Sequence, residues 1–254
     1  MKFKEFLPSE EAGKFIRNYW KFDIRESQEQ SFPFLHESLP ENTLSIVLIK
    51  RGRFQGIRYM GIQTKRFQQE IQEEASLLGI RIHPWLISPQ LFPRKSDLLN
   101  ITAAFNHAAP NLMKILHADW EKDEQVLIQL IEKACLKLFP TIQMEENELV
   151  KYVCLLMEKG IKVKEVVEEL PISIRPLQKL FKSTTGISMK QYQDIARIRK
   201  ATIDLYTAQQ DRFDIIYTHG FFDQSHFIND FKRKMDRSPK DFLNYHKSFE
   251  IDLA

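Results

Sequence analysis

SIRPLQKLFK, residues 173–182, reads as a short helix with two unlike faces. Leu177, Leu180 and Phe181 recur at helical spacing and are expected to point into a core. Ser173 stands where an N-cap side chain would accept hydrogen bonds from the free amides of the first turn. The opposite face suits either solvation or DNA reading, because Arg, Gln and Lys side chains can contact base edges and phosphates. That face carries Arg175, Gln178, Lys179 and Lys182.

The pattern returns fifty residues later, and the register holds without a gap. Phe181 is matched by Phe231, and Ser173 is matched by Asp223, which is another N-cap type. Each copy reads as a short apolar helix, a tight turn, a capped helix with a polar face and a second capped helix. The chain therefore predicts two helix-turn-helix units in tandem. The outer face of the second reading helix carries Gln224, Ser225, Asn229, Lys232 and Arg233.

One long helix is predicted between the two units, over residues 188–208. Ser188 and Gln191 have the spacing of a capping box at its start. At about 1.5 Å per residue this helix would span on the order of 30 Å, which is close to the ~34 Å turn of B-DNA. A connector of this length can set two reading helices, near residues 174–184 and 224–234, into successive major grooves.

Residues from about 146 to 245 resemble the DNA-binding domain of the AraC/XylS family of bacterial transcription regulators. The most specific part is GFFDQSHF at residues 220–227, followed by FKR at 231–233 and by Ser238-Pro239. The resemblance implies a seven-helix, all-α domain in which one monomer reads a bipartite site in double-stranded DNA. It also implies RNA polymerase as a partner, and activation as the more common outcome.

Single residues carry the resemblance further. Arg175, Gln178 and Lys179 match the positions from which the first recognition helix of the family reaches bases. Asn229 departs from the family pattern, since many relatives have Arg or Lys there; Asn can pair with adenine but brings no charge. Asp230 is interpreted as a solvated surface residue that does not touch DNA.

The 254-residue chain is long enough for two domains, and 43% hydrophobic residues exclude a globally disordered protein. Residues 146–247 hold 18 Lys and Arg against 14 Asp and Glu, an excess of four. A modest local excess suits a protein that presents basic faces to DNA. No apolar run approaches the roughly 20 residues that cross a bilayer. Because residues 1–15 also lack the apolar segment of a signal peptide, we expect a cytoplasmic protein without membrane contact.

The first half mixes strand and helix signals. Branched and alternating residues predict strands at 19–24, 44–49, 57–62 and 75–83. A helix start is predicted at Pro8-Ser9-Glu10-Glu11, with Phe15, Ile16 and Tyr19 on one face. Further helices are predicted from Pro110 and over residues 123–139.

We therefore expect an α+β protein. A mixed α/β domain, a small sheet plus helices, would occupy residues 1–142, and an all-α tandem helix-turn-helix domain would occupy 143–254. GIRIHP at residues 79–84, after GIQT at 61–64, resembles an uncharacterised N-terminal domain often found on such regulators. This second resemblance implies a sensing or dimerising domain without naming an effector.

Candidates for binding a small-molecule effector are few. His36, Arg81, His83 and Trp85 combine polar and aromatic groups, although strand ends and core packing would explain them equally. No cofactor or metal is expected, because Cys135 and Cys154 lack metal-ligand spacing and read as buried thiols.

The predicted helix over residues 123–139 has an apolar stripe that suits either a core or a homodimer interface. The stripe comprises Val126, Leu127, Leu130, Ile131, Ala134 and Leu138.

The rival to a regulator is an enzyme, in particular a DNA-repair methyltransferase carrying the same type of DNA-binding domain. That chemistry needs a metal-bound or activated thiolate, yet the first cysteine is Cys135. The chain also lacks the G-x-S-x-G and Walker motifs of hydrolases and phosphoryl transferases. We therefore expect a sequence-specific regulator that is not an enzyme.

Overall fold

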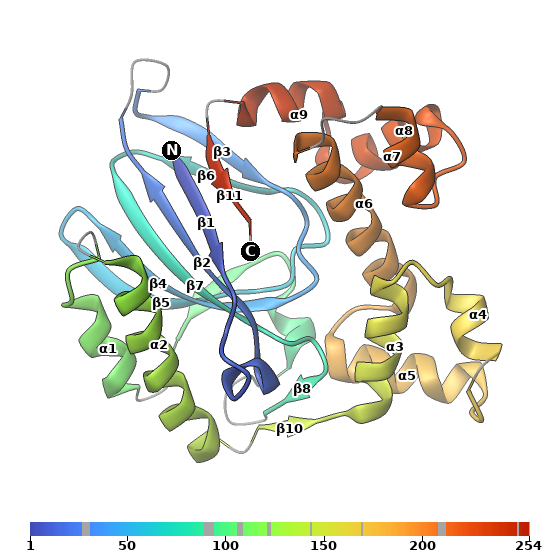
Figure 1. Cartoon of the computed structure of the whole chain (residues 1–254), viewed down its shortest axis with the longest axis horizontal. Helices are drawn as coiled ribbons and strands as arrows, with labels where there is room; N and C mark the ends of the chain where they lie inside the picture. The colour runs from blue at the N-terminus through green and yellow to red at the C-terminus, as the bar shows by residue number, and fades with distance from the viewer. Residues whose placement is uncertain are drawn as a thin grey trace.

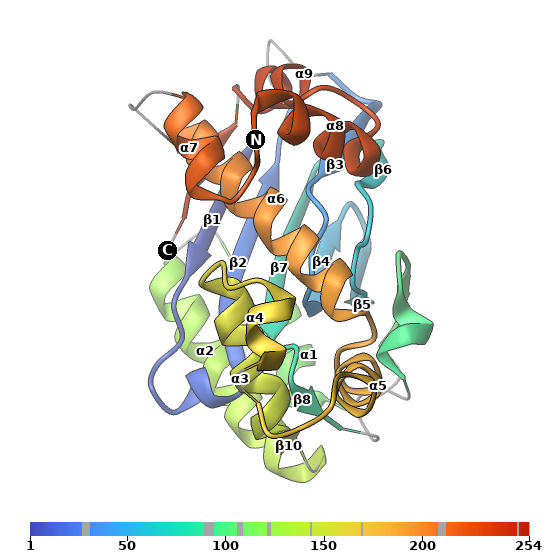
Figure 2. The ribbon, with the colours of Figure 1, turned by 90° about the vertical axis from the view of Figure 1, so that its right-hand side faces the viewer.

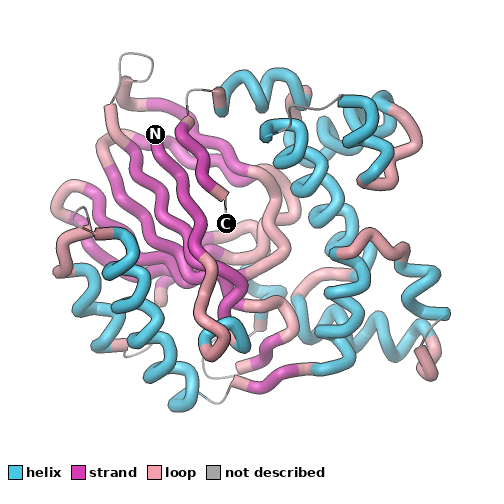
Figure 3. The backbone as a smooth tube through the Cα atoms, in the orientation of Figure 1, coloured by secondary structure: helices cyan, strands magenta, loops and turns pink. Residues whose placement is uncertain are grey.

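The computed structural model describes residues 1–26, 31–88, 94–105, 109–120, 123–142, 144–168, 170–207, 212–247 and 249–253. The fold is α+β, as the sequence predicts: a sheet-rich first half is followed by a helical second half (Figures 1 and 3). None of the described helices combines the length and the apolar character needed to cross a bilayer.

A seven-stranded sheet forms the centre of the first half, in the order β11-β1-β2-β7-β4-β5-β9. All neighbours pair antiparallel except β1 and β11, which are parallel. Two short ribbons, β3 with β6 and β8 with β10, complete the strands. The strand bounds are β1 Lys2–Phe6, β2 Ile16–Ile24, β3 Phe34–Ser38, β4 Leu44–Arg51, β5 Phe54–Met60, β6 Phe67–Ile71, β7 Ala75–Ile82, β8 Leu86–Ile87, β9 Thr102–Ala104, β10 Glu145–Glu146 and β11 Glu250–Asp252.

The two faces of the sheet bury different partners, because side chains alternate along each strand. On β4, Ile46 and Leu48 join the core under helices α1 (Pro110–Leu116) and α2 (Glu124–Leu138). Val47 points the other way and joins a second, aromatic-rich cluster with Phe34 of the β3–β6 ribbon. The ribbon therefore covers the face of the sheet opposite the helices (Figure 1).

The helix predicted to start at residues 8–11 is not present in the structure as an α-helix. Residues 12–14 form only a 3-10 turn, η1 (Ala12–Lys14), and no α-helix follows it before β2. Ile16 and Tyr19 are buried on strand β2 instead. Strand β2 is buried along nearly its whole length, and a register shift between Ile16 and Asn18 lets Ile16 and Tyr19 join the same core although they are three residues apart. This spacing therefore looked helical in the sequence. Strands β1, β9 and β11 were also missed, and β6 lies in a segment that the sequence left unassigned.

The helical second half contains seven α-helices in its described parts, as the family resemblance implies. The first unit places α4 (Val163–Glu168) before the reading helix α5 (Ile174–Thr185), and the second places α7 (Arg212–Thr218) before α8 (Gln224–Met235). Each unit has a supporting helix beside it. These are α3 (Glu148–Glu158) and α9 (Pro239–His246).

The connecting helix α6 (Met189–Thr207) crosses diagonally between the two units, as Figure 2 shows. Its predicted capping box is confirmed: the Ser188 amide donates to Gln191 Oε1 at 3.0 Å, and the Gln191 amide donates to Ser188 Oγ at 3.2 Å. These bonds satisfy amides that the first turn leaves free. The two reading units are therefore joined by one continuous, well-defined helix.

The core of the first unit is continuous with that of the sheet. Val150, Phe181 and Ile195 belong to the same buried cluster as Ile46. The second unit has its own cluster around Phe231, with Ile198 of α6. Strand β11 follows the last helix and returns to the sheet edge, so the helical half is attached at both ends. The division at 142/143 stays a prediction; it falls at the end of the short turn η3 (Phe139–Ile142).

The apolar stripe on α2 divides into two sets. Leu127, Ile131, Ala134 and Leu138 are buried in the core. Val126 and Leu130 are 50% and 44% exposed, so this part of the stripe faces away from the molecule.

Candidate nucleic-acid interface and adjoining cavity

The first reading helix, α5, presents its predicted polar face to solvent. Leu177 and Phe181 are fully buried beneath it, which fixes the opposite face outward. Ser173 stands at the N-cap position in an extended conformation, but its side chain makes no capping hydrogen bond. That part of the prediction was wrong, and the Ser173 hydroxyl is left exposed beside the first turn. The exposed polar set is Ser173, Arg175, Gln178, Lys179 and Lys182.

The second reading helix, α8, has the same arrangement. Phe227 and Phe231 are buried, and the Asp223 side chain caps the helix by accepting from the His226 amide at 2.7 Å. His226 Nδ1 in turn lies 3.2 Å from the Phe222 amide and accepts its hydrogen. The exposed polar set is Gln224, Ser225, Asn229, Lys232 and Arg233.

Asp230 is the exception on α8, and its interpretation as a solvated surface residue was wrong. It is 8% exposed and accepts from Arg197 of α6 at 2.7 Å and from Arg233 at 2.8 Å. The Arg197 guanidinium also lies over the Phe221 ring, 4.3 Å from its centroid. Asp230 thus ties the second reading helix to the connecting helix. It also occupies one side of the Arg233 guanidinium that the sequence assigned to DNA.

The connecting helix is tied to the first half by a buried ionic network. Arg199 of α6 donates to the Pro40 carbonyl at 2.9 Å and lies 3.2 Å from Glu41 Oε2. Arg81 of β7 lies 3.2 Å from the same Glu41 oxygen and also bonds Glu5. Burial opposes ionisation of Glu41, but Arg199 and Arg81 outweigh it and hold the pKa of Glu41 at about 2. Glu41 therefore stays charged and bridges both halves.

A second tie joins the end of α8 to the β3–β6 ribbon. Arg66 donates from its backbone amide to the Lys234 carbonyl at 2.9 Å, and its guanidinium lies 2.9 Å from Asp236. Arg237 reaches the buried Glu37 of β3 at 3.1 Å. The connecting helix and the second reading unit are therefore held against the first half, while the polar faces of α5 and α8 remain exposed.

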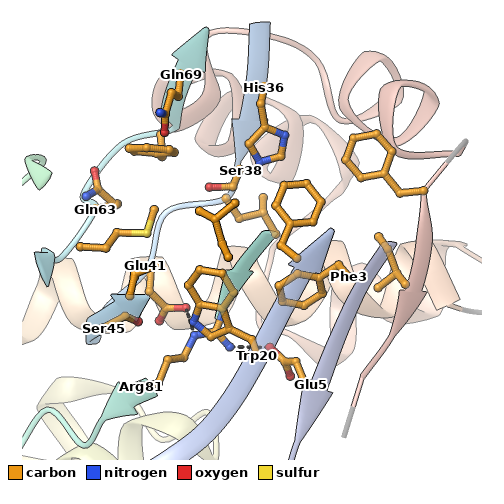
Figure 4. A pocket seen from close by; sticks show the side chains of 18 of the residues that line it. Phe3, Glu5, Trp20, His36, Ser38, Glu41, Ser45, Gln63, Gln69 and Arg81 are labelled. Atoms are coloured by element: carbon orange, nitrogen blue, oxygen red, sulfur yellow. Dashed lines mark hydrogen bonds and ion pairs between the residues drawn. The ribbon is translucent and has the colours of Figure 1, made fainter. Parts of the chain in front are cut away.

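A cavity of about 230 Å³ lies between the two halves. Its floor is the sheet, one wall is the β3–β6 ribbon, and α6, α9 and β11 close it from the helical half. His36 and Arg81, two of the four predicted effector-binding candidates, line this cavity (Figure 4). Burial and the neighbouring His246 lower the pKa of His36 to about 3, so its imidazole is neutral near pH 7.

The other two candidates lie elsewhere. The rings of His83 and Trp85 stack on each other with centroids 4.3 Å apart, and neither residue lines the cavity. His83 Nε2 lies 2.9 Å from the Gly13 carbonyl, and burial lowers the pKa of His83. The packing explanation, which the sequence left open for both, accounts for their positions.

Sequence reasoning missed most of the cavity. Trp20, Glu41 and Arg199 all line it, yet they come from a strand, a turn and a distant helix. Alternation on β2 could have placed Trp20 opposite the buried Tyr19. Nothing local in the sequence joins Glu41 to Arg199, since 158 residues separate them and only the docking of α6 brings them together.

Comparison with known proteins agrees with this geometry. Residues 166–245 match a family model described as a helix-turn-helix domain, and residues 4–102 match a domain of unknown function, DUF6597. The "HTH-type transcriptional activator RhaS" of Escherichia coli O139:H28 is 34% identical over 76 residues, which cover 30% of this chain and 27% of that protein. RhaS of Klebsiella pneumoniae (strain 342) is 34% identical over 77 residues, which cover 30% of this chain and 28% of that protein. The chain thus spans little more than a quarter of the length of these relatives.

One solved structure shows a similar overall fold. ToxT from Vibrio cholerae superimposes with a TM-score of 0.50 at 15% sequence identity. The match covers 89% of this chain and 98% of ToxT. The likeness supports the arrangement of a sheet-rich first half followed by a helical second half.

Proposed function

We propose that this chain, whose C-terminal domain is of the AraC/XylS helix-turn-helix type, regulates transcription by binding a bipartite DNA site. One observation carries the proposal: both reading helices expose a polar face, and each stands on a fully buried aromatic support, Phe181 in α5 and Phe231 in α8. The 19-residue helix α6 joins the two units. Two rigidly supported polar faces suit two successive major grooves of one duplex.

The residues have different parts in this proposal. Arg175, Gln178 and Lys179 project from α5 toward base edges, and Arg and Gln can contact guanine and adenine in bidentate fashion. Lys182 and Lys232 lie toward the ends of their helices and contact phosphates. Ser173, Gln224, Ser225, Asn229 and Arg233 complete the interface.

We further propose that the partners are double-stranded DNA and RNA polymerase, within the cytoplasm, with a small-molecule effector and a second copy of the chain as additional partners. The exposed Val126 and Leu130 on α2 support the homodimer. The cavity between the halves supports the effector.

We also propose that the chain is not an enzyme. The rival DNA-repair methyltransferase needs a nucleophilic thiolate. Both cysteines are fully buried, and burial raises the pKa of Cys135 and of Cys154. These thiols are protonated at neutral pH and out of reach of a base in DNA.

The test is binding-site selection on randomised duplex DNA with the full chain, followed by affinity measurements at several salt concentrations. We expect an enriched bipartite sequence and an affinity that falls as salt rises. Replacing both Arg175 and Lys179 by Ala should abolish enrichment of one half-site. The matched control replaces exposed Arg53 and Lys114 of the first half by Ala, which removes the same charge away from the reading helices. An equal loss in the control would attribute binding to overall charge and overturn the proposal.

A further inference from the structure

The cavity between the halves has an aromatic floor, and one glycine makes room for it. A Cβ atom on Gly79 would stand 1.9 Å from the Trp20 ring, so only glycine lets this indole lie flat against strand β7. Phe3 stacks on the same indole at 6.1 Å between ring centroids, and the Phe22 ring lies beside the Phe3 ring. Figure 4 shows Phe3 and Trp20 side by side in the cavity. The floor is therefore broad and apolar.

Polar side chains also line the cavity, among them Ser38, Gln63 and Gln69, and His36 is the one that lies among aromatic rings. His36 projects from β3 into the cavity (Figure 4), with its ring 4.9 Å from Phe22 and 6.1 Å from Phe249. The Tyr245 hydroxyl lies 3.4 Å from its Nδ1 atom. The remaining ring nitrogen, Nε2, can donate to or accept from a group inside the cavity, depending on the tautomer. The low pKa of His36 keeps this ring uncharged.

The charged groups at the opposite end of the cavity are already matched. Glu5, Glu41, Arg81 and Arg199 form two acidic and two basic groups that pair with one another. A charged ligand beside them would upset a balanced, buried network, which costs free energy. Arg58 also lines the cavity, and its guanidinium lies over the Phe54 ring at 5.7 Å. Among the described residues no acidic group pairs with Arg58.

From this arrangement we propose that the cavity binds an uncharged, largely apolar small molecule whose single hydroxyl or carbonyl group hydrogen-bonds to His36. The molecule lies on the rings of Phe3 and Trp20 and touches α6 through Ile203. Sugars do not fit this chemistry, because an apolar floor would leave most of their hydroxyl groups unpaired. The inference rests on the proposed function, in which this cavity holds the effector, and it names the chemical class of that effector.

The first test uses the full chain and the uncharged fluorescent probe N-phenyl-1-naphthylamine. The probe should become brighter on binding, and 1-octanol should displace it. Octanoate has the same chain length but carries a charge, and we expect it to need at least about tenfold higher concentration. Equal or better displacement by octanoate, lost in the variant Arg58→Gln, would show that the cavity takes an anion and would overturn the proposal.

A second experiment locates the probe. Ile203→Trp places a larger side chain in the cavity from a partly exposed position on α6, and it should abolish probe binding. Thr207→Trp introduces the same side chain at an exposed position one turn further along the same helix, and it should leave binding unchanged. Undiminished binding in Ile203→Trp would place the probe elsewhere and sink the idea.

A third comparison tests the hydrogen bond. His36→Phe keeps an aromatic ring but removes the nitrogen, so displacement by 1-octanol should weaken about fivefold while the probe itself, which does not need this bond, is unaffected. His83→Phe is the matched control, because His83 is another partly buried, ring-stacked histidine that lies outside the cavity. If the concentration of 1-octanol that displaces the probe is the same in His36→Phe as in the wild type, His36 does not bind the ligand and that part of the proposal is wrong. DNA binding is measured on the same preparations, so a chain that takes the probe but no DNA would contradict the proposed function alone.

Discussion

Arg175 and Lys232 are both exposed on the proposed reading helices, but Arg175 lies at the start of α5 and Lys232 in the last turn of α8. Arg175 is in the first turn of α5, where side chains reach base edges. We expect Arg175→Ala to cost about 1–3 kcal/mol of binding free energy and to relax specificity at one base pair. Binding-site selection with the variant measures both. Retention of full sequence preference would show that Arg175 does not read a base.

Lys232 lies in the last turn of α8, where a basic side chain holds a phosphate. Lys232→Ala should therefore weaken all sequences alike and reduce the slope of log affinity against log salt by about one. Asn229→Ala, near the middle of the same helix, should change little unless the base that Asn229 contacts is adenine. If Lys232→Ala weakens binding only to sites with one particular base, Lys232 contacts a base and not a phosphate, and the assignment is wrong.

At the scale of elements, the contact between α6 and α8 depends on Asp230. Its carboxylate pairs with Arg197 at 2.7 Å, and both side chains are mostly buried. Asp230→Ala would leave the Arg197 charge without this partner, so we expect a loss of about 1–3 kcal/mol of folding stability. The second half-site should lose selectivity while the first keeps it, because the partners of this pair lie on α6, on α8 and in the turn before α8.

Thermal unfolding and site selection on the Asp230 variant test the expectation together. Asp241→Ala is a useful comparison, since Asp241 is an exposed acid in the first turn of α9. Equal loss of selectivity in both half-sites would argue that Asp230 acts on the whole domain rather than on α8.

The elements also show what local sequence can and cannot predict. The ends of helices α5, α6 and α8 were predicted to within one or two residues. This was possible because the helical spacing of apolar residues and the capping residues, such as Ser188 and Asp223, are local features of the sequence. Strands β1 and β11 were missed, since both are short and their pairing with each other joins the two ends of the chain. For the same reason the cavity residues Trp20 and Arg199 could not be grouped before the fold was known.

For the whole molecule, Glu41 is one of the charges that join its two halves. Its pKa of about 2 lies below the ordinary value, so the stabilisation it gives is complete above about pH 5. That stabilisation is lost as the pH falls toward 2. Glu41→Gln should lower stability at pH 7 and flatten the dependence of stability on pH in this range. Urea unfolding between pH 7 and 3 measures it, with exposed Glu148→Gln as the control. If the free energy of unfolding of Glu41→Gln falls with decreasing pH as steeply as that of the wild type, Glu41 does not stabilise the contact between the halves.

The oligomeric state is a second property of the whole molecule. Leu130 is 44% exposed on α2, next to Val126 on the same helix. If this patch joins two copies, Leu130→Glu should convert a dimer into a folded monomer, as read by sedimentation with and without DNA. Leu127→Glu, at a position only 2% exposed, should instead unfold the first half. A wild-type chain that sediments as a monomer under both conditions would dismiss the homodimer.

The parallel pairing of β11 with β1 makes the helical half, in topological terms, a loop that is anchored at both ends on the sheet-rich half. The chain leaves the sheet-rich half through β10 and comes back beside its own first strand, where Glu250 pairs with Lys2. A body tethered at both ends cannot swing about one hinge; it can only turn about the line that joins its two anchor points. Fraying the last strand should therefore change the mechanical freedom of α5 and α8 without altering any residue of the proposed DNA-binding faces.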